Sequence, residues 1–124
     1  MMTVGVVNVD HTKNRFFVEG TITLSGNYGT SGGALPHGDA LDLTGLCPSS
    51  SPPTNLIAWS TVMQGAAPQY DLYQFNPGTG QGNGILQIIV AGAEMTPGNA
   101  YASTAPTNAA GYVLHFQAEF PAFA

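Results

Sequence analysis

The chain has 124 residues, and its two basic and seven acidic side chains give a net charge of −5 and a charged fraction of 7%. A typical soluble domain is roughly 25% charged, and two basic residues exclude the clustered Lys and Arg of a nucleic-acid-binding surface. No apolar run approaches the ~18 residues of a membrane-spanning helix, so neither nucleic acid nor a membrane is an expected partner.

The start of the chain shows alternating apolar and polar residues, the period of a half-buried strand. Residues 1–14 begin with MMTVGVV and are expected to form either an N-terminal arm or an edge strand. The alternation is cleanest over residues 15–25, with Thr and Glu on one face and large apolar side chains on the other. Gly20 falls in the apolar row, which predicts a bulge or a close crossing at this position.

The middle of the chain alternates between turn-rich and strand-like segments. Residues 27–38 contain many glycines and are expected to form turns. Residues 39–46 predict a strand that places Leu41 and Leu43 on one side, and the three prolines and three serines of 47–55 predict an exposed loop.

The second half begins with an alternating strand over residues 56–64, whose Trp59 is expected to lie in the core. Residues 76–84 read as a hairpin loop that ends in a strong Asn-Gly turn pair. Residues 85–91 form the most apolar strand, which is expected to be buried on both faces or covered by a partner. The complete set of expected strands is 1–7, 15–25, 39–46, 56–64, 70–75, 85–91 and 112–120.

No window of eleven or more residues combines helical spacing with helix caps, so the predicted class is all-β. The spacing of the turn signals is typical of sandwiches and small barrels. We therefore expect a single domain over residues 15–121, a two-sheet sandwich of jelly-roll-like type, followed by a short tail at 122–124. The apolar rows of 16–24 and 112–120 should form the core together with Trp59.

The residues that carry chemistry are scattered. No two of the three histidines, His11, His37 and His115, lie near each other in sequence, as a β-barrel metal site would require. Asp39 and Asp42 are three apart, which places them on opposite faces of a strand. The remaining acids fall on separate elements, and the lone Cys47 cannot form an internal disulfide. We expect no catalytic residues, no metal and no cofactor, so the chain is not expected to be an enzyme.

The aromatic and apolar residues give a stronger indication of function. Phe17 lies in the polar row of its strand, and Phe123 follows Pro121 near the C-terminus. Either ring would face water unless a partner covered it. Together with Ile85 and Ile89 of the most apolar strand, these two are the predicted partner-interface residues. The low charge of the whole chain likewise favours a component of a protein assembly.

Five segments carry a resemblance to a known family: FFVEGTITLSGNY, GDALDLTGL, YDLYQFNPGTG, GILQIIVAG and YVLHFQAEFP, which together span residues 14–121 approximately. In their order they resemble the capsid decoration or cement proteins of tailed bacteriophages, small structural proteins encoded beside the major capsid protein. The resemblance implies a β-sandwich that is made in the bacterial host cytoplasm and binds the outside of the capsid lattice. It also implies the major capsid protein as a partner and no catalytic residues.

Two further hypotheses remain open at this stage. A β-sandwich with exposed aromatic rings is also typical of a carbohydrate- or host-receptor-binding module of a phage particle, and an enzyme of cupin or glycosidase type ranks last.

The exposed strand edges and the apolar run at residues 85–90 predict a homo-oligomer, either a dimer or a trimer. At least one terminus, 1–14 or 121–124, is expected to dock as an arm on a neighbouring subunit or on the capsid.

Overall fold

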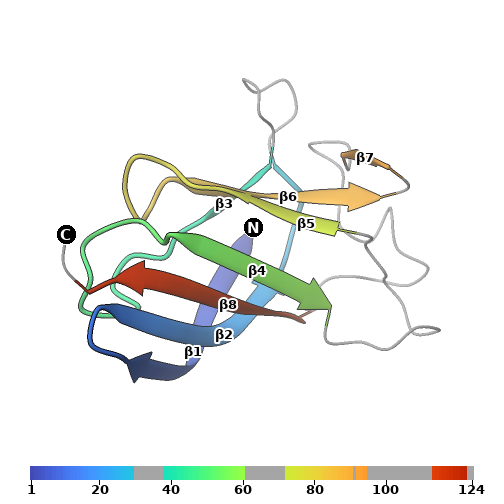
Figure 1. The fold of residues 1–124 in the computed structure, drawn as a ribbon. Coiled ribbons are helices and arrows are strands. Elements are labelled where there is room, and N and C mark those ends of the chain that lie inside the picture. Colours follow the sequence, from blue (N-terminus) through green and yellow to red (C-terminus); the bar gives the residue numbers. More distant parts are fainter. Residues whose placement is uncertain (30–37, 61–71, 91, 95–112, 123–124) are drawn as a thin grey trace.

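The computed structural model describes residues 1–29, 38–60, 72–90, 92–94 and 113–122, and within them all regular structure is β-strand. The strands form two antiparallel sheets that pack face to face, which confirms the predicted all-β, two-sheet sandwich (Figure 1). Their bounds are β1 (Met2–His11), β2 (Arg15–Leu24), β3 (Asp39–Leu41), β4 (Asn55–Ser60), β5 (Leu72–Asn76), β6 (Gly84–Val90), β7 (Ala93–Glu94) and β8 (Val113–Pro121).

The larger sheet has the strand order β1-β2-β8-β4, and the smaller sheet has the order β3-β6-β5, with the short β7 also paired to β6. From β2 to β5 each successive strand lies in the other sheet. The last strand, β8, inserts between β2 and β4 in the larger sheet. These crossings between the layers give the sandwich its jelly-roll-like character.

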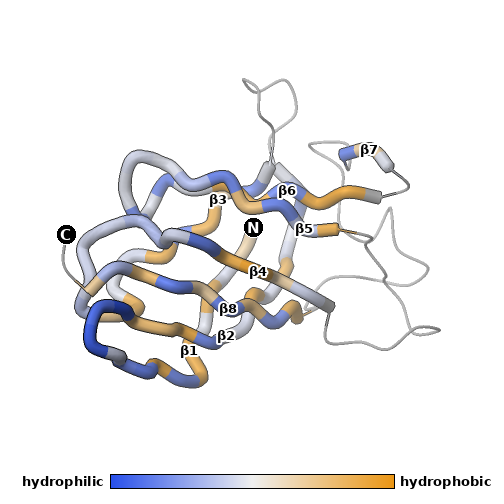
Figure 2. The backbone as a smooth tube through the Cα atoms, in the orientation of Figure 1, coloured by the Kyte–Doolittle hydropathy of each residue, from blue (hydrophilic) through white to orange (hydrophobic). Residues whose placement is uncertain are grey.

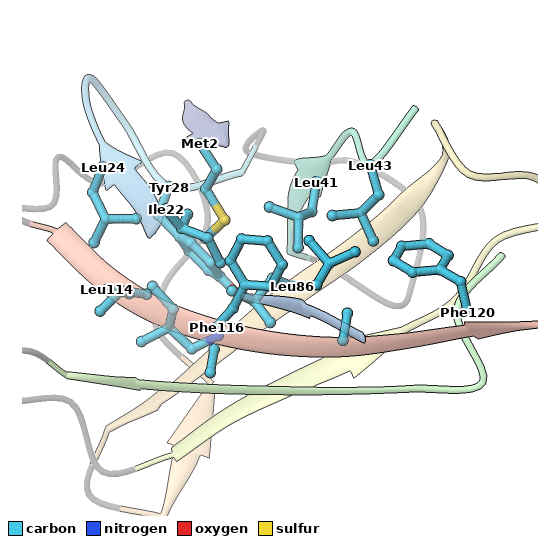
Figure 3. Close-up of a cluster of buried hydrophobic side chains, with 14 of the residues drawn as sticks. Met2, Ile22, Leu24, Tyr28, Leu41, Leu43, Leu86, Leu114, Phe116 and Phe120 are labelled. Atoms are coloured by element: carbon cyan, nitrogen blue, oxygen red, sulfur yellow. Dashed lines mark hydrogen bonds between the residues drawn. The ribbon is translucent and has the colours of Figure 1, made fainter. Parts of the chain in front are cut away.

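The core lies between the sheets and follows directly from the alternation in the sequence. Figure 2 shows hydrophobic and hydrophilic residues alternating along β8, where Leu114, Phe116 and Phe120 are fully buried or nearly so. Leu41 and Leu43 reach the same core from the smaller-sheet side, as expected (Figure 3). The largest fully buried side chains are Tyr28, Phe116, Phe120, Ile22, Leu24, Leu41, Leu43, Leu86, Ile88, Leu114 and Val18.

Gly20 of β2 lies close to both the backbone of β1 and the ring of Phe116. A Cβ atom at this position would lie 2.1 Å from the carbonyl oxygen of Gly5 and 2.7 Å from Cε1 of Phe116. Only a residue without a side chain fits between them. The close crossing predicted for Gly20 is therefore present.

Residues Met2–His11 form an edge strand, β1, which pairs antiparallel with β2 along its whole length. Its first residues contribute to the core of the domain, since Met2 is 7% exposed and belongs to the core cluster. The reason is register: Met2 lies opposite Leu24, so its side chain points between the sheets.

Trp59 does not lie in the core, contrary to expectation, and is 44% exposed. In β4 the buried residue is Ala58, which faces inward opposite Phe116, whereas Trp59 lies opposite His115 on the outer face. Because β4 runs beside β5 of the other sheet (Figure 1), its inward position takes a small side chain. Alternation alone predicted the two rows of this strand correctly but not which row faces inward.

Tyr28 is a core residue within a stretch that was predicted only as turn. Its side chain is fully buried, its hydroxyl donates to Oε1 of Glu94 at 2.8 Å, and it accepts a hydrogen bond from the Ile88 amide at 3.1 Å. Burial raises the pKa of the phenol above its usual value. Along β6, pairing with β3 ends at Leu86 and pairing with β7 starts at Ile89, so the tyrosine occupies the gap between these two strands.

Candidate protein-binding surface

The outer face of the larger sheet is built from the outward-pointing residues of β4, β8 and β2. Cross-strand register places Trp59, His115 and Thr21 in one row across the sheet. The neighbouring row contains Ile57, Gln117 and Glu19. These rows form a sheet surface of neutral polar and apolar side chains, with a carboxylate only at its β2 side.

Two large apolar side chains lie exposed on this face, at its β4 border. Ile57 is 61% exposed and Trp59 is 44% exposed. The indole of Trp59 stacks on the imidazole of His115, with ring centroids 5.8 Å apart and planes inclined by 25°. We call Ile57, Trp59, His115 and Gln117 the Trp59 patch. An exposed Trp beside an exposed Ile is an arrangement that protein interfaces use.

Two carboxylates flank the Trp59 patch: Glu119, which is paired with Arg15, and the exposed Glu19, which lies opposite Gln117 on β2. The guanidinium of Arg15 lies 2.6 Å from the carboxylate of Glu119, and Asn55 donates to the same carboxylate at 3.0 Å. A partner that covers Ile57 and Trp59 and leaves Glu19 at the solvated rim therefore need not strip water from an unpaired charge, which would cost several kcal/mol or more.

The predicted interface residues do not come together on one surface. Phe17 lies on the outer face of the larger sheet, where it is half-buried between its register neighbours Asp10 and Glu119. Ile85 and Ile89 are half-buried on the outer face of the smaller sheet, the opposite side of the sandwich. Phe123 lies outside the described residues.

Sequence reasoning missed the exposure of Ile57 and Trp59, because the composition of the segment LIAWS points to the opposite result. One row of this strand carries Ile57 and Trp59, and the other carries Leu56, Ala58 and Ser60. A buried strand usually turns its larger row inward, so the composition favoured the wrong face. Only the position of β4 at the border of the sandwich decides against it.

The titratable residues of the described segments do not form a reactive cluster. No group of three His, Cys, Asp or Glu side chains gathers as a metal site would in this part of the chain. His11 stacks on Phe16 at 4.3 Å, as His115 does on Trp59, and Cys47 packs half-buried against the core. Hydrogen bonds from the side-chain hydroxyl of Thr44 and, secondly, from its backbone amide at 2.9 Å lower the pKa of the Asp42 carboxyl.

Among the described residues, no helix is long and apolar enough to cross a membrane. Comparisons with protein-family models, with curated proteins and with solved structures found no match. The function must therefore be argued from the fold and from the chemistry of its surfaces.

Proposed function

We propose that this protein is a virion structural protein that decorates the outside of a tailed-bacteriophage capsid and stabilises the lattice against internal pressure. Its partners are the major capsid protein and further copies of itself. The observation that carries the proposal is the exposed pair Ile57 and Trp59 at the β4 border of an open sheet face. The resemblance of the sequence to phage decoration proteins supplies the identity of the partner.

The chemistry of the Trp59 patch suits attachment to another folded protein. Burying an isoleucine fully contributes on the order of 1.5–3 kcal/mol, and aromatic side chains carry a large share of the free energy of many interfaces. The threonines and glutamine around the pair provide neutral hydrogen-bonding groups for the rim of such an interface. A sheet face with these properties fits the surface of a capsid subunit without specific charge pairing.

Co-sedimentation with capsids that lack the protein tests this proposal. Ile57→Thr keeps a β-branched strand residue but removes apolar area from the Trp59 patch, and we expect it to lower capsid occupancy at least tenfold. Leu72→Thr is the matched control, because Leu72 is 55% exposed on the other sheet. Failure of the wild-type protein to sediment with capsids, or equal loss for both variants, would contradict the proposal.

A carbohydrate- or receptor-binding module is the second candidate function. The exposed indole of Trp59, with the polar side chains of Gln117 and Thr21 nearby, is also a surface on which a sugar ring could stack. A glycan array separates the candidates. Glycan binding that is lost in Trp59→Thr and retained in Ile57→Thr would favour this function over capsid decoration.

A further inference from the structure

β1 is a ten-residue strand at the border of the larger sheet. In the described part of the chain only β2 pairs with it. Proteins usually protect such an edge with Lys, Pro, inward-pointing charge or a β-bulge. Met2–His11 contains neither Lys nor Pro, and Asp10 is its only acid, so a bulge between Val6 and Asn8 is the one such device in this strand. On either side of the bulge the edge is open to pairing with another strand.

The backbone groups that face outward from β1 follow from the hydrogen bonds at its two ends. Ser25 donates its amide to the Met1 carbonyl at 2.9 Å, and Thr12 donates its amide to the Arg15 carbonyl at 2.9 Å. In an antiparallel ladder, residues that bond to one neighbour alternate with residues that face the other. A β-bulge interrupts the register between Val6 and Asn8. The residues whose backbone groups face outward are therefore Met2, Val4 and Val6 before the bulge, and Val9 and His11 after it.

The same row of residues presents apolar side chains that the smaller sheet does not cover. Val6 is 43% exposed and Val9 is 38% exposed, although both lie on the face that belongs to the core elsewhere in the sheet. Val7, at the bulge, is 70% exposed. The second half of β1 lies on the side of the molecule away from β5 and β6 (Figure 1).

We propose that β1 pairs antiparallel with β1 of a second copy of this chain, about a two-fold axis that passes between Val6 and Val7. In this register Met2 lies opposite His11 of the second copy, so all ten residues of the strand are paired. Val4 of one copy lies opposite Val9 of the second copy. The exposed valines of each β1 strand therefore lie beside valines of the other β1 strand. The bulge makes this register possible. The outward-facing backbone groups before the bulge in one copy lie opposite the outward-facing backbone groups after the bulge in the other copy.

The charges of β1 permit this pairing. Asp10 lies opposite Thr3 of the second copy, and the two Asp10 residues are seven positions apart along the strands. At ~3.3 Å per residue this is about 23 Å, more than two Debye lengths at physiological salt. Although each chain has a net charge of −5, no like charges therefore lie face to face where the two β1 strands meet.

The dimer joins two four-stranded sheets into one sheet of eight strands. Because the two-fold axis is perpendicular to this sheet, both Trp59 patches face the same side. The two β4 strands stand seven strand spacings apart, about 34 Å at ~4.8 Å each. This last consequence rests on the proposed function: the dimer would attach to a lattice through two patches at once and gain avidity.

Disulfide trapping tests the register in the free protein, without capsids. In a Cys47→Ala background, Thr3→Cys combined with Asp10→Cys places two thiols opposite each other across the dimer axis. We expect this double variant to form a covalent dimer on mild oxidation. Each single-cysteine variant is the control and should remain monomeric on a non-reducing gel, because its two thiols are about 23 Å apart in the dimer.

Light scattering supplies the second readout. We expect the wild-type protein to be a dimer and Val9→Lys to raise its dissociation constant at least tenfold while the circular dichroism spectrum is unchanged. Leu72→Lys, at another exposed apolar site, should remain dimeric. A wild-type monomer at high micromolar concentration, or covalent dimers from the single cysteines alone, would overturn the proposal. Capsid binding by that monomer would show that the proposed function stands without the dimer.

Discussion

The hydroxyl of Tyr28 accepts a hydrogen bond from the backbone amide of Ile88, which lies 60 residues further along the chain, at 3.1 Å. The same hydroxyl donates to Glu94 at 2.8 Å. One buried side chain thus takes the place of a strand on the edge of β6, between β3 and β7. The segment after β2 is fixed to the smaller sheet by this contact.

We predict that Tyr28→Phe destabilises the protein although the ring still fills its place in the core. The variant leaves the Ile88 amide without its hydroxyl acceptor, and an unsatisfied buried donor costs about 1–3 kcal/mol. Urea unfolding at neutral pH measures the difference. An unchanged urea midpoint would show that this hydrogen bond makes no net contribution to the free energy of unfolding.

The stability of the wild-type protein should also fall in alkaline solution. The pKa of Tyr28 is raised in the folded state, whereas a tyrosine in the unfolded chain ionises near ~10. Above pH ~10 the unfolded state therefore loses a proton that the folded state keeps, and stability falls by up to about 1.4 kcal/mol per pH unit from this residue. The stability gap between wild type and Tyr28→Phe should narrow from pH 9 to pH 11 in urea titrations. If the difference in unfolding free energy between the two proteins stayed constant over this pH range, the raised pKa of Tyr28 would not be the cause of the alkaline destabilisation.

Gly20→Ala should destabilise the sandwich, since the new methyl group would lie 2.1 Å from the Gly5 carbonyl oxygen and 2.7 Å from the Phe116 ring. Overpacking of this kind costs about 1–3 kcal/mol, and more where backbone must move. Gly80→Ala is the control, because its nearest neighbour would be 4.0 Å away. Thermal unfolding of both variants checks the prediction, and equal melting temperatures would contradict it.

Deletion of residues 1–8 should lower the melting temperature clearly. The deletion removes most of the β1 ladder and the buried Met2, and truncating a buried methionine to alanine alone costs about 2–5 kcal/mol. This result is the opposite of what a free arm would give. A nearly unchanged melting temperature would show that β1 is dispensable for the isolated domain.

The fold could be predicted from the sequence because alternation along β2 and β8 is clear, with Phe17 and Gly20 as its exceptions in β2, and the large apolar row of each strand faces inward. The conformation at Gly20 followed from the same pattern. Trp59 could not be placed, since which face of β4 is buried depends on where that strand lies in the sandwich. Tyr28 was missed because its burial depends on β6 and β7, whose positions no local pattern reveals.

The predicted interface residues show the same limit. Phe17 and Ile89 were each identified from the sequence pattern of a single strand. Such a pattern does not show on which outer face of the sandwich the residue will lie, or beside which other residues. The exposed edge of β1 was equally invisible. An edge is defined by the order of strands in a sheet, which depends on contacts between segments far apart in the sequence.

Trp59 is the only tryptophan of the chain, so its fluorescence reports directly on the Trp59 patch. Binding of the lattice by the Trp59 patch can be tested by titrating the wild-type protein with capsids that lack it and monitoring tryptophan emission against capsids alone. If the Trp59 patch is the docking surface, the emission should shift to shorter wavelength and saturate at a fixed number of copies per particle, as water is excluded from the indole. Protein that co-sediments with capsids while its Trp59 emission stays that of the free protein would contradict the claim that this face binds the lattice.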